Sequence, residues 1–145
     1  MKVVVLFKEY DWDYYRVKGV YSLEGAKLLK EYYLEIFNKE SEETIKDYQN
    51  QIVELKEKRR KATHLAELVL PNEKAAKEAG DMLLFKTLHK TRKQYLNEAN
   101  GYSTDIWKIE YRINELLNMP DENKIIKYMN DNHLYFSETE ILEHP

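Results

Sequence analysis

Both ends of the chain have the pattern of β-strands. Residues 2 to 8, 15 to 21 and 134 to 142 are rich in β-branched and aromatic side chains. The acidic residues 9 to 14 are too polar for a buried strand and are expected to form the long connection of a hairpin. The side chains predicted to share one face of the second strand are Tyr15, Val17, Gly19 and Tyr21. Because an isolated hairpin is marginal in water, we expect the three segments to form one small antiparallel sheet.

The middle of the chain has the periodicity of helices instead. Ser22 is suited to cap a first helix, and residues 38 to 41 interrupt its pattern before a second helix begins. Apolar positions of residues 45 to 69 then follow a seven-residue repeat, which is typical of helices that pack along a seam. Pro71 and Asn72 are predicted to end this second helix.

A return helix is expected over residues 73 to 98, with Gly80-Asp81 as a point where it bends or splits. Residues 41 to 98 would thus form an antiparallel helical hairpin. The Asn100-Gly101 pair resembles the end of a helix, and further helices are expected on both sides of Pro120.

These elements predict an α+β, mostly helical fold. It combines a small antiparallel sheet with four to five helices, and the length of 145 residues suits a single domain, 1 to 145, from which the hairpin projects. The absence of cysteine favours a reducing compartment, and the apolar run of residues 3 to 7 is too short for a signal peptide or a membrane span. We therefore expect a cytoplasmic protein with no membrane contact.

No motif of a known catalytic centre is present. The serines lie outside nucleophile-elbow motifs, four scattered glycines cannot build a phosphate-binding loop, and the histidines lack the spacing of metal ligands on a helix. We expect no enzyme activity, no catalytic residue and no cofactor. Glu9, Asp11 and Asp13 are weak candidates for a Mg²⁺ or Ca²⁺ site, and a solvated acidic loop explains the same pattern.

The acidic segment is also aromatic. Tyr10, Trp12 and Tyr14 could form a contact loop, since exposed aromatic side chains often carry the binding energy of interfaces. In the alternative, Trp12 packs beneath the loop.

A basic zone is predicted in the helical hairpin. Folding about Pro71 and Asn72 would bring residue 59 opposite about residue 84, so that two cationic segments become neighbours. The candidate anion-binding or partner-binding residues are Lys56, Arg59, Arg60, Lys86, His89, Lys90 and Lys93. Arg59 occupies an inward position and needs a partner, which could be Glu54 or Glu57, a second subunit, or an anionic ligand. An ordinary solvated helix face is the alternative.

The outer part of the hairpin has more apolar residues than a two-helix seam can cover. Leu65, Leu68, Leu84 and Phe85 are therefore predicted to contact another subunit or a partner protein.

The opening of the chain combines a predicted strand, an acidic aromatic segment and a second strand that ends in a Gly-Val-Tyr-Ser turn. The residues of this pattern are Val3 to Phe7, Glu9 to Asp13 and Gly19 to Ser22. In this pattern the chain resembles small uncharacterised accessory proteins of phages and prophages of low-GC bacteria. The resemblance implies a phage accessory protein, a group in which host-defence antagonists that bind proteins, nucleic acids or nucleotide signals are common. Together with the absence of catalytic motifs, it predicts a non-catalytic binding protein that engages a host protein or a signalling molecule. The helical hairpin is expected to assemble this protein into a homo-oligomer. The alternative is binding of nucleic acid or a phosphorylated nucleotide through the basic zone.

Overall fold

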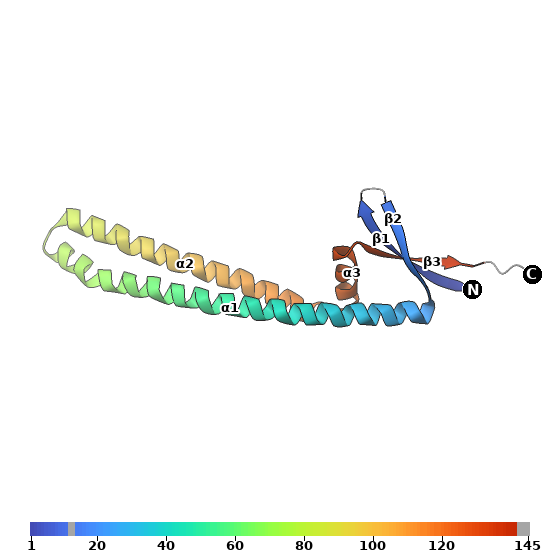
Figure 1. Cartoon of the computed structure of the whole chain (residues 1–145). Helices are drawn as coiled ribbons and strands as arrows, with labels where there is room; N and C mark the ends of the chain where they lie inside the picture. Colours follow the sequence, from blue (N-terminus) through green and yellow to red (C-terminus); the bar gives the residue numbers. More distant parts are fainter. Residues whose placement is uncertain (12–13, 142–145) are drawn as a thin grey trace, which may run out of the picture. The chain divides into compact units, whose positions relative to one another are not determined.

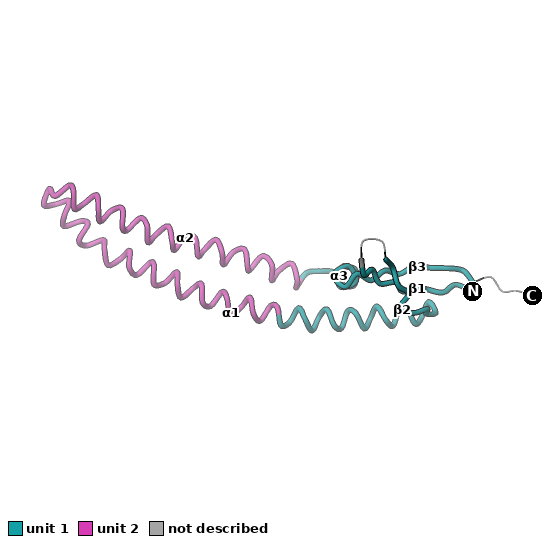
Figure 2. The backbone as a smooth tube through the Cα atoms, turned by 45° about the horizontal axis from the view of Figure 1, so that its top comes forward, with its two compact units in different colours: residues 1–43, 118–145 teal, residues 44–117 magenta. Residues whose placement is uncertain are grey.

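A computed structural model describes residues 1–11 and 14–141. The elements follow in the order β1 (Lys2–Asp11), β2 (Tyr14–Ser22), α1 (Leu23–Glu78), α2 (Met82–Asn118), α3 (Asp121–Asp131) and β3 (Leu134–Glu140) (Figure 1). They belong to two compact units (Figure 2). The sheet unit comprises residues 1–43 and 118–145, and the hairpin unit comprises residues 44–117.

The sheet unit confirms that the two ends of the chain meet. The strand order is β2-β1-β3 with antiparallel pairing throughout. One sheet face packs against α1 and α3, where Leu6, Tyr33 and Met129 form the buried cluster. The rings of Tyr33 and Tyr128 stack with their centroids 4.9 Å apart, and Lys124 Nζ donates to Asn38 Oδ1 at 3.0 Å. These contacts fix α3 against the first turns of α1.

The strand β2 contains a bulge, so its side chains do not alternate between the two sheet faces as predicted. Val20 pairs with Val5 and Val17 pairs with Phe7, which leaves Lys18 as an extra residue. Directly paired residues of an antiparallel ladder point to the same sheet face, so Val17 and Val20 share one face. The prediction that Tyr15, Val17, Gly19 and Tyr21 share a face is therefore wrong, because Gly19 and Tyr21 lie on the opposite one.

The expected long connection at residues 9 to 14 is also wrong. Glu9 pairs with Tyr15, and Asp11 pairs with Tyr14, so most of this segment belongs to the ladder. Polar residues are tolerated there because this end of the hairpin is not buried. Residues 12 and 13 lie outside the described part of the chain.

The described residues form three helices rather than four or five, because three predicted breaks do not occur. The helix α1 continues through residues 38 to 41 and through Pro71, and α2 continues through Gly101. Pro71 and Gly101 are exposed, so their poor helix propensity does not compete with packing in the hairpin. The expectation that Pro120 opens a short helix is confirmed by α3.

The chain reverses at Gly80 rather than at Pro71. Gly80 has a φ of 73°, the left-handed conformation that favours glycine. The amide of Gly80 donates to the carbonyl of Lys77, and the amide of Asp81 donates to that of Ala76, which is the Schellman pattern of a helix C-terminus. Asp81 Oδ1 then accepts the amide of Leu84 at 3.2 Å and caps α2.

Two complete heptad patterns face each other in the hairpin unit, and we call them the seam. Every seam residue is buried or half-buried. On α1 the seam consists of Ile45, Tyr48, Ile52, Leu55, Arg59, Ala62, Ala66, Val69, Glu73 and Ala76. On α2 it consists of Phe85, Leu88, Arg92, Tyr95, Ala99, Tyr102, Ile106, Ile109, Ile113 and Leu116.

Candidate functional site

Glu73 is the buried charged residue of the seam, with 4 % of its surface exposed. Arg92 donates through Nε to Glu73 Oε2 and through Nη2 to Oε1, the latter at 3.3 Å. His89 Nδ1 lies 2.6 Å from Glu73 Oε1. The hydrogen bond from Arg92, supported by His89, lowers the pKa of Glu73 to about 2. Glu73 therefore stays ionised, and it binds Arg92 together with His89, one of the residues that the sequence assigned to ligand binding.

Arg59 has a different partner from those predicted. Its Nη1 donates to Ser103 Oγ of α2 at 3.3 Å, whereas Glu57 pairs with the exposed Arg60 at 2.7 Å. Glu57, one of the two carboxylates suggested as partners of Arg59, thus pairs with Arg60 instead, and a second subunit or an anionic ligand stays a prediction. The guanidinium remains half-buried with a hydroxyl as its acceptor.

The same register separates the two cationic segments. Arg59 lies opposite Ser103, and Glu73 lies opposite His89. At 1.5 Å per residue, the centres of the two segments are about 20 Å apart along the hairpin. The predicted basic zone is therefore wrong as a single site, because it assumed a turn about eight residues too early.

One cationic segment retains a hollow on the surface of the hairpin unit, which we call the basic patch. It has a volume of about 390 Å³. Its lining consists of Lys56, Arg59, Arg60, Thr63, His64 and Glu67. In the other segment, Lys86, Lys90 and Lys93 remain exposed.

The four residues of the predicted apolar interface lie in different places in the structure. Leu65 and Leu68 are exposed in the last third of α1, and Leu84 is exposed beside the turn. Phe85 instead belongs to the seam, where it stacks on His89 with ring centroids 5.7 Å apart and Lys77 Nζ lies 5.8 Å from its ring centroid. Phe85 is therefore a packing residue of the hairpin, and the four residues do not form one patch.

The turn itself presents an apolar cluster that the sequence did not single out as a unit. Met82, Leu83 and Leu84 are all exposed, and Leu83 has 80 % of its surface in solvent. We call these three residues the apolar tip. They begin α2 directly after Asp81, at the left end of the hairpin in Figure 1. Three apolar residues directly after Gly80-Asp81 would have indicated an apolar turn. The prediction of the turn at Pro71 placed them inside a helix instead.

An exposed aromatic pair on α2 was also missed. Trp107, 64 % exposed, stacks on Tyr111 with ring centroids 6.0 Å apart. The two residues lie one turn apart and outside the seam, which a heptad assignment of α2 would have shown.

The aromatic residues at the end of the β1–β2 hairpin lie only partly within the described chain. Tyr10 and Tyr14 are exposed, with ring centroids 6.4 Å apart. Lys18 lies 5.2 Å from the Tyr10 ring centroid, and its hydrogen bond lowers the pKa of Tyr10. The predicted contact residue Trp12 lies outside the described residues.

Of the three acidic residues Glu9, Asp11 and Asp13, the structure describes the side chain of Glu9. Glu9 Oε2 accepts a hydrogen bond from the Tyr135 hydroxyl at 3.0 Å, and this bond raises the pKa of Tyr135. Asp13 and the side chain of Asp11 lie outside the described part. Among the residues that were described, no group of three His, Asp or Glu side chains is placed to hold a metal ion.

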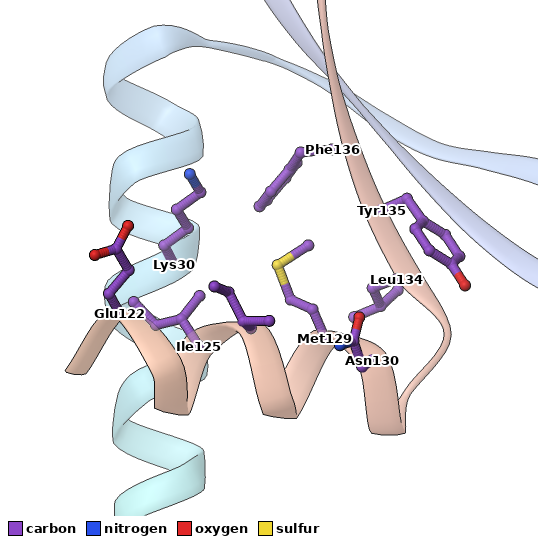
Figure 3. A pocket seen from close by; sticks show the side chains of 9 residues that line it. Lys30, Glu122, Ile125, Met129, Asn130, Leu134, Tyr135 and Phe136 are labelled. Atoms are coloured by element: carbon purple, nitrogen blue, oxygen red, sulfur yellow. The ribbon is translucent and has the colours of Figure 1, made fainter. Parts of the chain in front are cut away.

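The sheet unit contains a groove that the sequence did not predict. Figure 3 shows its lining from α1, α3 and β3, including Ile125, Met129 and Phe136, and its volume is about 360 Å³. Lys30 and Glu122 contribute the charged groups of the lining, and Lys30 Nζ lies 5.4 Å from the Phe136 ring centroid. The groove is thus a shallow extension of the core with few directional contacts.

No protein-family model matches this chain, and the comparisons with curated proteins and with solved structures found no match either. Within residues 1–11 and 14–141, no helix is long and apolar enough to span a membrane.

Proposed function

We propose that this chain is a non-catalytic protein-binding factor that contacts its partner through the end of the helical hairpin. The observation that carries this proposal is the exposure of the three consecutive residues Met82, Leu83 and Leu84 at the turn. Three consecutive large apolar side chains in water are costly unless a partner covers them. The resemblance of the opening to phage accessory proteins supports a host protein as that partner.

The construction of the turn supports this proposal. The Schellman bonds at Gly80 and the Asp81 cap satisfy several of the backbone groups at both helix ends without using the side chains of residues 82 to 84. The seam begins only at Phe85 on this helix. Leu83 therefore adds nothing to the hairpin core, and it is free to serve as an interface anchor.

The test is site-specific photo-crosslinking in cells with a benzophenone amino acid at position 83. The matched control is position 53, where Val53 is an equally apolar and exposed residue on the outer side of α1. We expect a discrete heavier adduct from position 83 alone, and its loss when Leu84→Glu is added. Equal labelling from both positions, or none from position 83, would contradict the proposal.

The basic patch supports a second candidate function, the binding of nucleic acid or a phosphorylated nucleotide. Arg59 is anchored by Ser103 while Lys56 stays exposed beside it, so a phosphate could receive more than one cationic contact. Lys56→Glu with Arg60→Glu should abolish binding of a labelled RNA or DNA at low salt. Lys86→Glu with Lys90→Glu, on the other segment, should leave that binding intact.

A further inference from the structure

The sheet unit has a second apolar surface, on the face opposite the core. Phe7, Val17 and Tyr135 form one row across the three strands, and Val5 pairs with Val20 in the next row. Figure 3 shows Tyr135 on the side of β3 opposite Phe136, which lines the groove of the core side. We call the surface of Val5, Phe7, Tyr15, Val17, Val20 and Tyr135 the outer sheet face.

The outer sheet face is open in the described chain. Val17 and Val20 have exposed fractions of 54 % and 58 %, and Tyr15 and Tyr135 are exposed as well. The rings of Tyr15 and Tyr135 meet edge to face with centroids 6.1 Å apart, and Phe7 lies in the strand between theirs. An antiparallel sheet that packs its core on one face normally presents polar residues on the other, so this apolar surface requires an explanation.

The bulge at Lys18 is what makes this face continuous. Without the extra residue, Val17 and Val20 would point to opposite faces, and one of them would lie on the core side. As an edge strand, β2 could also pair with a strand of another chain. The bulge and the charged Arg16 and Lys18 discourage such pairing. The irregularity thus favours stacking of the face over extension of the edge.

We infer that the outer sheet face is a contact surface between two copies of this chain, which stack sheet on sheet about a two-fold axis. In such a contact the outer sheet face of one copy packs against the outer sheet face of the other. Like charges would then meet, so the face must not carry an excess of one charge. In the described residues that pair on this face, Glu9 is the charged group, and it lies at one end with Tyr135 as its hydrogen-bond donor. Two sheets of identical twist also stack naturally at about 10 Å.

In the paired residues that the structure describes, no lysine or arginine lies on this face, which argues against nucleic acid as its occupant. The area of the outer sheet face indicates how stable the dimer should be. Three strands about 4.8 Å apart with seven paired residues in β3 give a face of about 14 Å by 23 Å. This is smaller than the surface that each partner gives to a standard interface, so the dimer should be weak and reversible.

The absence of cysteine from the chain permits a direct test. Val20→Cys in the full chain, treated with a short bis-maleimide, should give a covalent dimer at protein concentrations near 100 µM. Leu28→Cys is the matched control, because Leu28 is an apolar residue of the same unit on α1 with 65 % exposure. It should remain monomeric under the same treatment.

Sedimentation equilibrium provides the second measurement. Val17→Lys with Val20→Lys should weaken dimerisation at least about 30-fold, whereas Leu28→Lys should leave it unchanged. The inference is overturned if Val20→Cys crosslinks no better than Leu28→Cys. It is also overturned if the double lysine variant keeps its helical circular dichroism and still dimerises, or if only Leu83→Glu dissolves the dimer. Should the lysine variant fail to fold, the crosslinking result decides alone.

Discussion

The guanidinium of Arg59 lies 3.3 Å from the hydroxyl of Ser103, across the seam between α1 and α2. Together with the contact of Glu73 to His89, this hydrogen bond defines which residues of the two helices face each other. Polar residues at seam positions restrict register, because a shifted pairing would leave a buried charge without its partner. The hairpin is therefore held in one alignment by two polar contacts about 21 Å apart along α1.

The first prediction concerns Glu73. Glu73→Gln should lower the thermal midpoint of the hairpin, because the half-buried guanidinium of Arg92 loses its ionised acceptor. Glu57→Gln is the control, since Glu57 forms an ion pair with Arg60 in which both side chains are exposed, and it should change the midpoint very little. Equal effects of the two substitutions, measured by circular dichroism, would show that the Glu73 cluster does not stabilise the seam.

The second prediction is an acid transition that depends on Glu73. Its pKa falls from the ordinary value of 4.5 to about 2 in the folded chain, so the unfolded chain binds a proton more readily. The stabilisation is fully present above pH 4.5 and is lost as the pH falls towards 2. The difference in midpoint between the wild type and Glu73→Gln should therefore shrink across this interval. A difference that stays constant down to pH 2 would refute the assignment.

The third prediction uses two exposed glycines with opposite expectations. Gly80 has a φ of 73°, so Gly80→Ala should destabilise the hairpin by about 1 kcal/mol although no neighbouring atom would clash. Gly101 lies inside α2 with open space around it, so Gly101→Ala should stabilise the chain by about 0.5 to 1 kcal/mol. Urea unfolding of both variants measures the two signs. If Gly80→Ala is neutral, the turn does not lie at Gly80.

The strands, the shared sheet and the existence of a helical hairpin could be predicted because their patterns are strong. The register of the two helices could not be predicted, because proline normally ends a helix and the sequence therefore places the turn at Pro71. The repeat in fact continues through Glu73 and Ala76, both buried. A proline on the outer side of a long helix leaves the seam intact, so packing outweighs propensity there.

The candidate binding residues depended on that register. Because the turn lies at Gly80 and not at Pro71, the two basic segments are apart and Phe85 belongs to the seam. The outer sheet face could not be found from alternation, because the bulge at Lys18 reverses the pattern halfway along β2. A bulge leaves no reliable signal in a single sequence unless the partner strand is already aligned.

The last prediction tests the cost of the proline that α1 contains. Pro71 lies inside the helix and is exposed, and it provides no amide for the carbonyl of Glu67, one turn earlier. Pro71→Ala supplies that donor and removes the clash of the ring, so it should stabilise the hairpin by about 1 to 3 kcal/mol. Pro120→Ala is the control, because Pro120 occupies the cap position of α3, where no helical hydrogen bond is lost. Urea unfolding followed at 222 nm compares the two. A destabilised Pro71→Ala would instead mean that the bend imposed by proline is needed to bring Glu73 to Arg92, and hydrogen exchange at Leu68 to Ala75 would then show the opened turn.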